Sequence, residues 1–216
     1  MRGQELLLTL DTNIIVYVAL RKSEDMSYAR EFNEQPSRFL THTVYKEANK
    51  LEERITQLEI LLNSNKRGDE PPSKIFERLE SEASKKLKEK LNRYFNNIIQ
   101  HYDDEYSAGK SIDQITKEII WEFSNFTNMD DRIRPGSEIL RKSEDEISQY
   151  ESWIERNNLV DREDKSIIVQ MQLHQDHTNK DLKLVTRDSG FYTEDSVWQQ
   201  NFPHIYVEDI SDDEEQ

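Results

Sequence analysis

Two aspartates in this sequence each follow a short apolar run. Asp11 ends the run of residues 5–10, and Asp188 follows the run of residues 182–186. Short continuous apolar runs are typical of buried strands in a parallel sheet, and open α/β sheets bind ligands at the carboxyl ends of their strands. We therefore expect Asp11 and Asp188 to lie close together at one edge of a sheet.

Two further acidic residues lie on predicted helices between these strands. Glu47 falls in or just beyond the first turn of one helix, and Asp164 begins another. Glu is common near helix starts because of the helix dipole, and Glu52 and Glu53 are rival candidates on the same helix. Asp161 competes with Asp164 in the same way. We interpret Asp161 as the N-cap and Asp164 as the ligand.

Four converging carboxylates would form a site for a hard cation. Like charges about 4 Å apart repel by roughly 1 to 4 kcal/mol per pair, so such a cluster takes up protons or a cation. Oxygen ligands in a chain without cysteine favour Mg²⁺ or Mn²⁺ over Zn²⁺. These ions polarise phosphodiesters and lower the pKa of water, which favours phosphodiester hydrolysis. We expect Asp11→Asn to abolish activity and to leave the fold intact or steadier.

The elements that must position these residues alternate between strand and helix patterns. Short strands are predicted at residues 5–10, 38–41, 182–186 and 205–207. Helices are predicted to begin near residues 12, 23, 43, 164 and 193. This order is typical of a parallel α/β sheet with right-handed crossovers.

The middle of the chain, residues 63–157, has helical periodicity, with predicted helices over 74–105, from 111 and over 137–153. Their apolar faces are too extensive to leave in water. We expect a helical insertion that caps the acidic site of a domain formed by residues 1–62 and 158–216. The densest basic stretch of the insertion is a candidate contact for nucleic-acid phosphates, although such stretches are more often solvated helix faces. It comprises Lys85, Lys86, Lys88, Lys90 and Arg93.

Four motifs resemble those of the PIN-domain family of metal-dependent nucleases. They are Leu10-Asp11-Thr12-Asn13, Glu47 after the second strand, Asp164 at the head of an apolar helix, and residues 184–191 with Thr186, Asp188 and Phe191. The resemblance covers roughly residues 4–62 and 158–208. It implies a three-layer α/β/α fold with a central parallel sheet. It also implies that Asp11, Glu47, Asp164 and Asp188 are catalytic metal ligands. We interpret Asn13 and Thr186 as supporting the carboxylates or a metal-bound water by hydrogen bonds, with a plain helix cap as the alternative for Asn13.

This resemblance implies an endoribonuclease that uses Mg²⁺ or Mn²⁺, although the sequence does not exclude DNA as the substrate. Many members of the family are toxins neutralised by a protein inhibitor, the antitoxin, and many form homodimers. The chain is larger than the compact toxins, which argues against a toxin role. Two alternatives stay open: a non-catalytic RNA-binding or scaffold protein of the same fold, and an enzyme that uses Asp11 as a phosphorylated nucleophile. Asn13 weakens the last, because such enzymes usually carry a second Asp there.

The composition restricts the partners and the compartment. The net charge of −15 has the wrong overall sign for binding nucleic acid, so phosphate contacts would need a local basic patch. A length of 216 residues suits one domain with a large insertion. The absence of cysteine excludes disulfides and thiol catalysis. No run approaches the roughly 18 apolar residues that span a bilayer, and no signal-peptide pattern is present, so no membrane association and a cytoplasmic location are expected.

Overall fold

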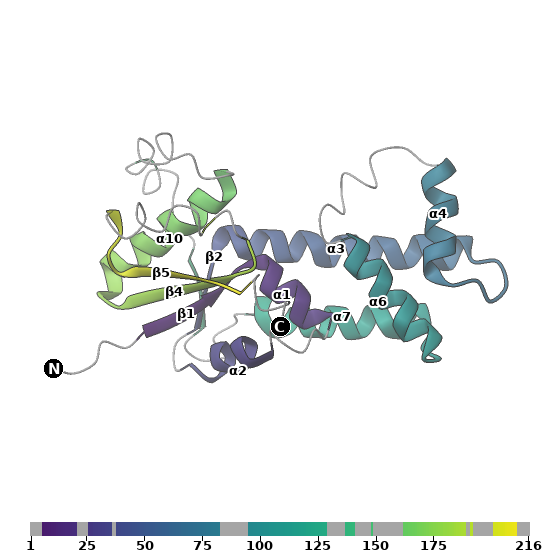
Figure 1. Cartoon of the computed structure of the whole chain (residues 1–216), viewed down its shortest axis with the longest axis horizontal. Coiled ribbons are helices and arrows are strands. Elements are labelled where there is room, and N and C mark those ends of the chain that lie inside the picture. Colours follow the sequence, from purple (N-terminus) through teal and green to yellow (C-terminus); the bar gives the residue numbers. More distant parts are fainter. Residues whose placement is uncertain are drawn as a thin grey trace. The chain divides into compact units, whose positions relative to one another are not determined.

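The computed structural model describes residues 6–20, 26–35, 38–82, 95–128, 137–140, 148, 162–188, 191 and 201–210. Within them the fold is α/β, with parallel strands and a majority of helix (Figure 1). The chain divides into two compact units. Unit 1 comprises Met1–Ile15, Ser23–Glu47 and Asn128–Gln216, and unit 2 comprises Val16–Lys22 and Ala48–Thr127.

Unit 1 is built on parallel strands, as the sequence predicts. A three-stranded sheet has the order β1 (Leu6–Leu10), β4 (Asp181–Thr186), β5 (Ile205–Asp209). A second pair joins β2 (Arg38–Thr41) to β3 (Ser137–Leu140). Strand β2 lies beside β1, where the Thr9 hydroxyl donates to the Phe39 carbonyl at 2.9 Å. Because β1 and β4 are parallel neighbours, their carboxyl ends lie at the same edge of the sheet.

Strand β1 is buried on both faces. Its last four residues, Leu7 to Leu10, are all buried, and successive side chains of a strand point to opposite faces. Such burial contributes about 1.5–3 kcal/mol for each leucine. The Gln35 side chain also holds the backbone of Leu8, accepting from its N–H at 2.6 Å and donating to its carbonyl at 3.0 Å. The burial of β1 and these hydrogen bonds therefore fix the backbone position from which Asp11 follows.

Helices begin directly after two strands of unit 1, β1 and β2. Helix α1 (Thr12–Ala19) starts directly after Asp11, and α3 (His42–Asn65) starts directly after β2. The Thr41 hydroxyl caps α3 by accepting from the Val44 N–H at 3.4 Å. Helix α2 (Met26–Glu34) packs against β1, and α10 (Arg162–Thr178) packs against β2, β4 and β5. Helix N-termini favour negative charge, so these starts suit carboxylates.

Strand β3 corrects one sequence prediction. We expected a helix to begin at Ser137, but Ser137–Leu140 is a strand in parallel register with β2, Ile139 lying opposite Leu40. Four residues are too few for a helical period to be distinguished from a strand, and pairing with β2 overrides the local preference. The strand falls within the segment 63–157 that we expected to form a helical insertion. It is also a strand that precedes Asp164 in the chain, and the sequence pattern did not predict one between residues 41 and 182.

Unit 2 is helical throughout its described residues. Helix α6 (Phe95–Ser107) packs against α4 (Pro72–Glu82) and α7 (Ile112–Thr127), and unit 2 also contains the part of α3 that follows Glu47. The Tyr102 hydroxyl and the Thr116 hydroxyl, both buried, are 2.5 Å apart, and burial raises the pKa of Tyr102. The end of α1 belongs to this unit, and the Tyr17 hydroxyl accepts from the Asn97 amide at 3.2 Å. The helices thus share one core.

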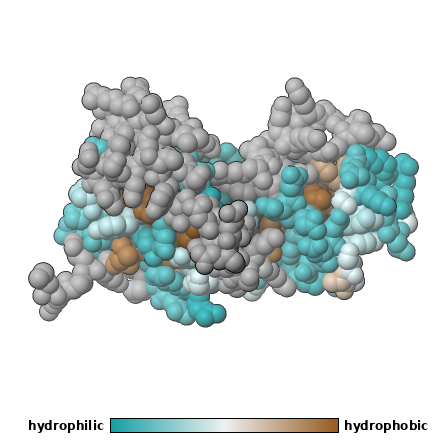
Figure 2. Space-filling view, in the orientation of Figure 1, coloured by the Kyte–Doolittle hydropathy of each residue, from teal (hydrophilic) through white to brown (hydrophobic). Residues whose placement is uncertain are grey.

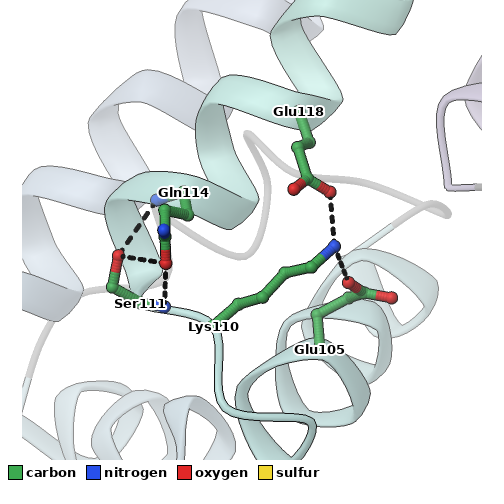
Figure 3. A network of polar contacts seen from close by, with 5 residues as sticks. All are labelled: Glu105, Lys110, Ser111, Gln114 and Glu118. Atoms are coloured by element: carbon green, nitrogen blue, oxygen red, sulfur yellow. Dashed lines mark hydrogen bonds and ion pairs between the residues drawn. The ribbon is translucent and has the colours of Figure 1, made fainter.

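The turn between α6 and α7 is fixed by polar contacts (Figure 3). The Lys110 ammonium lies between two carboxylates, forming ion pairs with Glu105 and, at 2.6 Å, with Glu118. Ser111 and Gln114 form a capping box: the Gln114 backbone N–H donates to the Ser111 hydroxyl at 3.3 Å, and the Ser111 N–H donates to the side-chain oxygen Oε1 of Gln114 at 2.9 Å. The predicted start of a helix at Ser111 is confirmed.

The units are bounded differently from the predicted division at residues 63 and 157. Apart from the end of α1, the unit 2 helices lie within residues 48–127, and residues 128–157 are grouped with unit 1. On the face drawn in Figure 2, the described residues are mostly hydrophilic, with small separate hydrophobic areas. None of the helices described has the length and apolar character to cross a membrane.

Candidate acidic site at the ends of β1 and β4

Asp11 and Asp188 follow the carboxyl ends of two neighbouring strands, as predicted. Strands β1 and β4 are parallel, with Leu10 opposite Val185. The Asp11 N–H donates to the Val185 carbonyl at 2.9 Å, which extends the strand pairing by one residue. Asp188 lies two residues beyond the end of β4. The two aspartates therefore leave the same edge of the sheet.

Asp11 is a buried carboxylate, 2% exposed, that is held by several donors. One oxygen accepts from the Thr12 N–H at 2.6 Å. The other accepts from the Asn13 amide at 2.8 Å and from the Thr186 hydroxyl at 2.7 Å. An ionised carboxylate is costly to bury unless it is hydrogen-bonded, and these contacts offset that cost. Asn13 and Thr186 thus make the hydrogen bonds to a carboxylate that we expected of them.

The same side chains fix the turn that carries Asp188. The Thr186 hydroxyl accepts from the Asp188 N–H at 3.0 Å. The Asn13 carbonyl oxygen accepts from the Arg187 N–H at 3.1 Å. Residues 187 and 188 are therefore tied to the loop after β1 as well as to their own strand. Asp188 itself is half-buried.

Glu47 is joined to the start of α1. The Thr12 hydroxyl, fully buried, donates to a Glu47 oxygen at 2.5 Å. Glu47 is half-buried on the second turn of α3. Thr12 therefore contacts Asp11 through its backbone and Glu47 through its side chain, so that one residue links two of the predicted acidic positions.

Asp164 lies in the first turn of α10 and is 9% exposed. Helix α10 packs against β2, β4 and β5, which brings this aspartate into unit 1 with the others. The competing residue, Asp161, lies outside the described residues, as do the candidate phosphate contacts Lys85, Lys86, Lys88, Lys90 and Arg93.

The donors of the site suit a hard cation in their chemistry. They are carboxylate and hydroxyl oxygens, the ligands that Mg²⁺ and Mn²⁺ prefer. In the part of the chain that the structure describes, no three Asp, Glu or His side chains are grouped closely enough to hold a metal ion. Hydrogen bonds of Thr12 and Thr186 connect Asp11 with Glu47 and with the turn that carries Asp188. Asp164 is placed in unit 1 by the packing of α10 against β2, β4 and β5.

Two buried polar residues of unit 1, Thr12 and Gln170, were not among the candidate site residues that the sequence suggested. In the sequence, only the position of Thr12 between Asp11 and Asn13 could have indicated that it takes part in the site. Gln170 is buried within the apolar stretch Ile167–Met171 of α10, where an amide is out of place. A polar residue inside an apolar helix face indicates a buried hydrogen-bonding partner, and this pattern could have identified Gln170.

Comparison with family models, with curated proteins and with solved structures returned no match for this chain.

Proposed function

We propose that this chain is a PIN-like, metal-dependent nuclease that hydrolyses phosphodiester bonds in RNA. The observation that supports this most is the linked pair of strand ends, where Asp11 and Asp188 are joined through the Thr186 hydroxyl. Open α/β sheets bind their ligands in the crevice outside the carboxyl ends of the strands, which is where these two residues lie. Sequence motifs resembling the PIN family point to the same four acidic residues.

In this proposal Asp11, Glu47, Asp164 and Asp188 would hold one or two Mg²⁺ or Mn²⁺ ions. When bound, such an ion polarises the phosphodiester and activates water at neutral pH. The protein's own side chains orient the ligands: Asn13 and Thr186 fix the Asp11 carboxylate, and Thr12 fixes Glu47. Fixed ligands lower the reorganisation needed when substrate binds, which is how positioning contributes to rate.

The direct test is cleavage of end-labelled single-stranded RNA by the purified full chain. We expect products with Mn²⁺ or Mg²⁺ present and none after EDTA is added. A DNA strand of the same sequence, assayed in parallel, reports the substrate preference. Asp188→Asn is the control, because this half-buried carboxylate would be a ligand. Cleavage that persists in EDTA, or that is unchanged in the variant, would contradict the proposal.

A second function, RNA binding or scaffolding without catalysis, is favoured by one observation. Both Asp11 oxygens already accept hydrogen bonds from protein donors, so that carboxylate is satisfied without a metal. Under this alternative, RNA would bind with the same affinity in Mn²⁺ and in EDTA and would remain intact. A gel-shift assay and a cleavage assay on the same samples separate the two functions.

The family resemblance also leads us to propose two protein partners. One is a protein inhibitor of the antitoxin type, which would suppress cleavage at a stoichiometric ratio. The other is a second copy of the chain. Light scattering of the purified protein over a range of concentrations measures the second, and a constant monomer mass would reject it.

A further inference from the structure

A buried polar network joins the first turn of α3 to α10. Gln170, 2% exposed, accepts a hydrogen bond from the Thr43 N–H at 3.3 Å. Its amide nitrogen donates to the Thr43 hydroxyl at 2.8 Å and to the Ser166 hydroxyl at 2.9 Å. The Thr43 hydroxyl donates to the Ser166 hydroxyl at 3.2 Å. A backbone N–H can only donate, so the Gln170 carbonyl must face it and the amide nitrogen must face the two hydroxyls.

This network satisfies two separate requirements at once. The first four N–H groups of a helix have no partner within the helix, and the Thr43 N–H is one of them. An amide inside an apolar helix face is costly to bury without hydrogen bonds, which is the situation of Gln170 within Ile167–Met171. Each need is met by the other helix, so the network is complete only in one arrangement of α3 and α10.

The network lies beside both helix-borne acidic residues. Thr43 and Glu47 are four residues apart on α3, and residues at this spacing share a helix face. Ser166 follows Asp164 by two residues at the start of α10. The two hydroxyls that Gln170 binds are therefore close in the chain to Glu47 and to Asp164. Any shift of α3 along α10 that broke these bonds would change the distance between the two carboxylates.

We propose that Gln170 is a positioning residue that holds α3 against α10 so that Glu47 and Asp164 serve one metal site. This inference rests on the proposed function, because it assigns Gln170 a role toward that site. A purely structural role would predict only a loss of stability when the amide is removed. A positioning role predicts in addition that metal binding becomes weaker, because two ligands are separated. Partners of this kind, which orient ligands without touching the metal, typically contribute 10- to 100-fold to metal affinity or activity.

The test measures Mn²⁺ binding to the full chain by calorimetry, with the metal alone and no RNA. Gln170→Met keeps a side chain of similar length and removes every hydrogen bond. We expect its Mn²⁺ affinity to fall about 10- to 100-fold. Gln172→Met is the matched control, because the Gln172 amide nitrogen bonds to Gln175 and Asp176 within α10. The control should bind Mn²⁺ as the wild type does.

A second comparison asks whether Gln170 acts through Glu47. In a Glu47→Gln background, Gln170→Met should cause little further loss of Mn²⁺ affinity, since the ligand it positions is already gone. Equal losses in both backgrounds would overturn the inference. Thr43→Val, which removes the hydroxyl from the α3 side, replaces Gln170→Met if the latter fails to fold, and the same loss of affinity is expected.

The outcomes separate the inference from the function it rests on. If the wild type binds Mn²⁺ and Gln170→Met binds it equally well at the same folded fraction, the positioning role is rejected and the nuclease proposal stands. If the wild type itself binds no Mn²⁺, the metal-dependent function is rejected, and the positioning role with it. Weakened binding in Gln170→Met alone, with Gln172→Met unchanged, supports both.

Discussion

The Thr12 hydroxyl donates a hydrogen bond of 2.5 Å to the Glu47 carboxylate, across 35 positions of sequence. Hydrogen bonds from a hydroxyl to a carboxylate fall at 2.5–2.7 Å and are about twice as strong as neutral ones. Thr12 is fully buried, and its backbone N–H holds Asp11 at 2.6 Å. One threonine therefore sets the positions of two acidic residues that come from a strand end and a helix.

Thr12→Val should separate the roles of shape and hydroxyl at this position. Valine has nearly the same shape but leaves Glu47 without this donor, so we expect unfolding to become easier by about 1–3 kcal/mol. If the proposed function holds, metal-dependent RNA cleavage should fall as well, because Glu47 loses this hydrogen bond. Urea denaturation and the RNA assay measure the two effects. Thr12→Ser keeps the hydroxyl and should behave close to wild type; equal behaviour of the two variants would show that the hydrogen bond is unimportant.

Asp11→Asn should lower stability. The sequence alone suggested an intact or steadier fold, on the argument that one repelling charge is removed. In the structure one Asp11 oxygen accepts from Asn13 and from Thr186, and an amide nitrogen there could not accept. We expect a loss of about 1–3 kcal/mol in the free energy of unfolding. Asp104→Asn, at an exposed position on α6, should change it by less than about 0.5 kcal/mol. A variant at position 11 as stable as wild type would restore the repulsion argument.

Glu59 should make the stability of unit 2 depend on pH. Burial raises the pKa of this carboxyl above its ordinary value, and the neighbouring Asp113 carboxylate raises it further. The folded state then holds its proton more tightly than the unfolded chain. Stability contributed by this group is present at low pH and is lost as the pH rises from the ordinary pKa of 4.5 through the raised value.

Glu59→Gln removes that titration. We expect the urea midpoint of the variant to exceed that of the wild type at pH 7, with the difference shrinking towards pH 4. Glu77→Gln, at an exposed position on α4, is the comparison and should follow the wild type at both pH values. If Glu59→Gln is instead less stable than wild type at pH 7, the carboxylate is stabilising and the burial argument is wrong.

Tyr102→Phe should destabilise unit 2 by about 0.5–1.5 kcal/mol, the usual contribution of one neutral hydrogen bond. The Thr116 hydroxyl donates to the Ile112 carbonyl at 3.0 Å, so the Tyr102 hydroxyl is the donor in the 2.5 Å contact. A double-mutant cycle with Thr116→Val isolates that contact, because the two losses should not add. Strict additivity would mean that the two hydroxyls stabilise the fold separately.

Strands β1 and β4 could be predicted from the local sequence, because burial leaves a pattern of apolar residues along the chain. Leu7, Leu8 and Leu10 are buried on both faces of β1, so the strand appears as an unbroken apolar run with a carboxylate directly after it. The last three residues of β4 are buried in the same way, and Asp188 follows two residues after the strand ends. Because parallel strands of this kind leave a sheet at one edge, the pairing of Asp11 and Asp188 followed from pattern alone.

Features that depend on distant partners were not visible in the same way. The Thr43–Gln170 bonds join residues 127 positions apart, and no local period marks them. Strand β3 has only four residues and becomes a strand by pairing with β2. Propensity and periodicity describe neighbours along the chain, so contacts that are created by packing remain beyond them.

The central claim is that the linked strand ends of β1 and β4 form a metal site, and Mn²⁺ binding by calorimetry tests it most directly. The measurement compares the wild type with Asp188→Asn at equal folded fractions, without RNA. Loss of a ligand should cost more than the roughly 10- to 100-fold that an outer partner contributes. The account predicts saturable Mn²⁺ binding by the wild type and a loss of affinity beyond 100-fold in Asp188→Asn. Equal affinity in the two proteins, or no saturable binding by either, would contradict it.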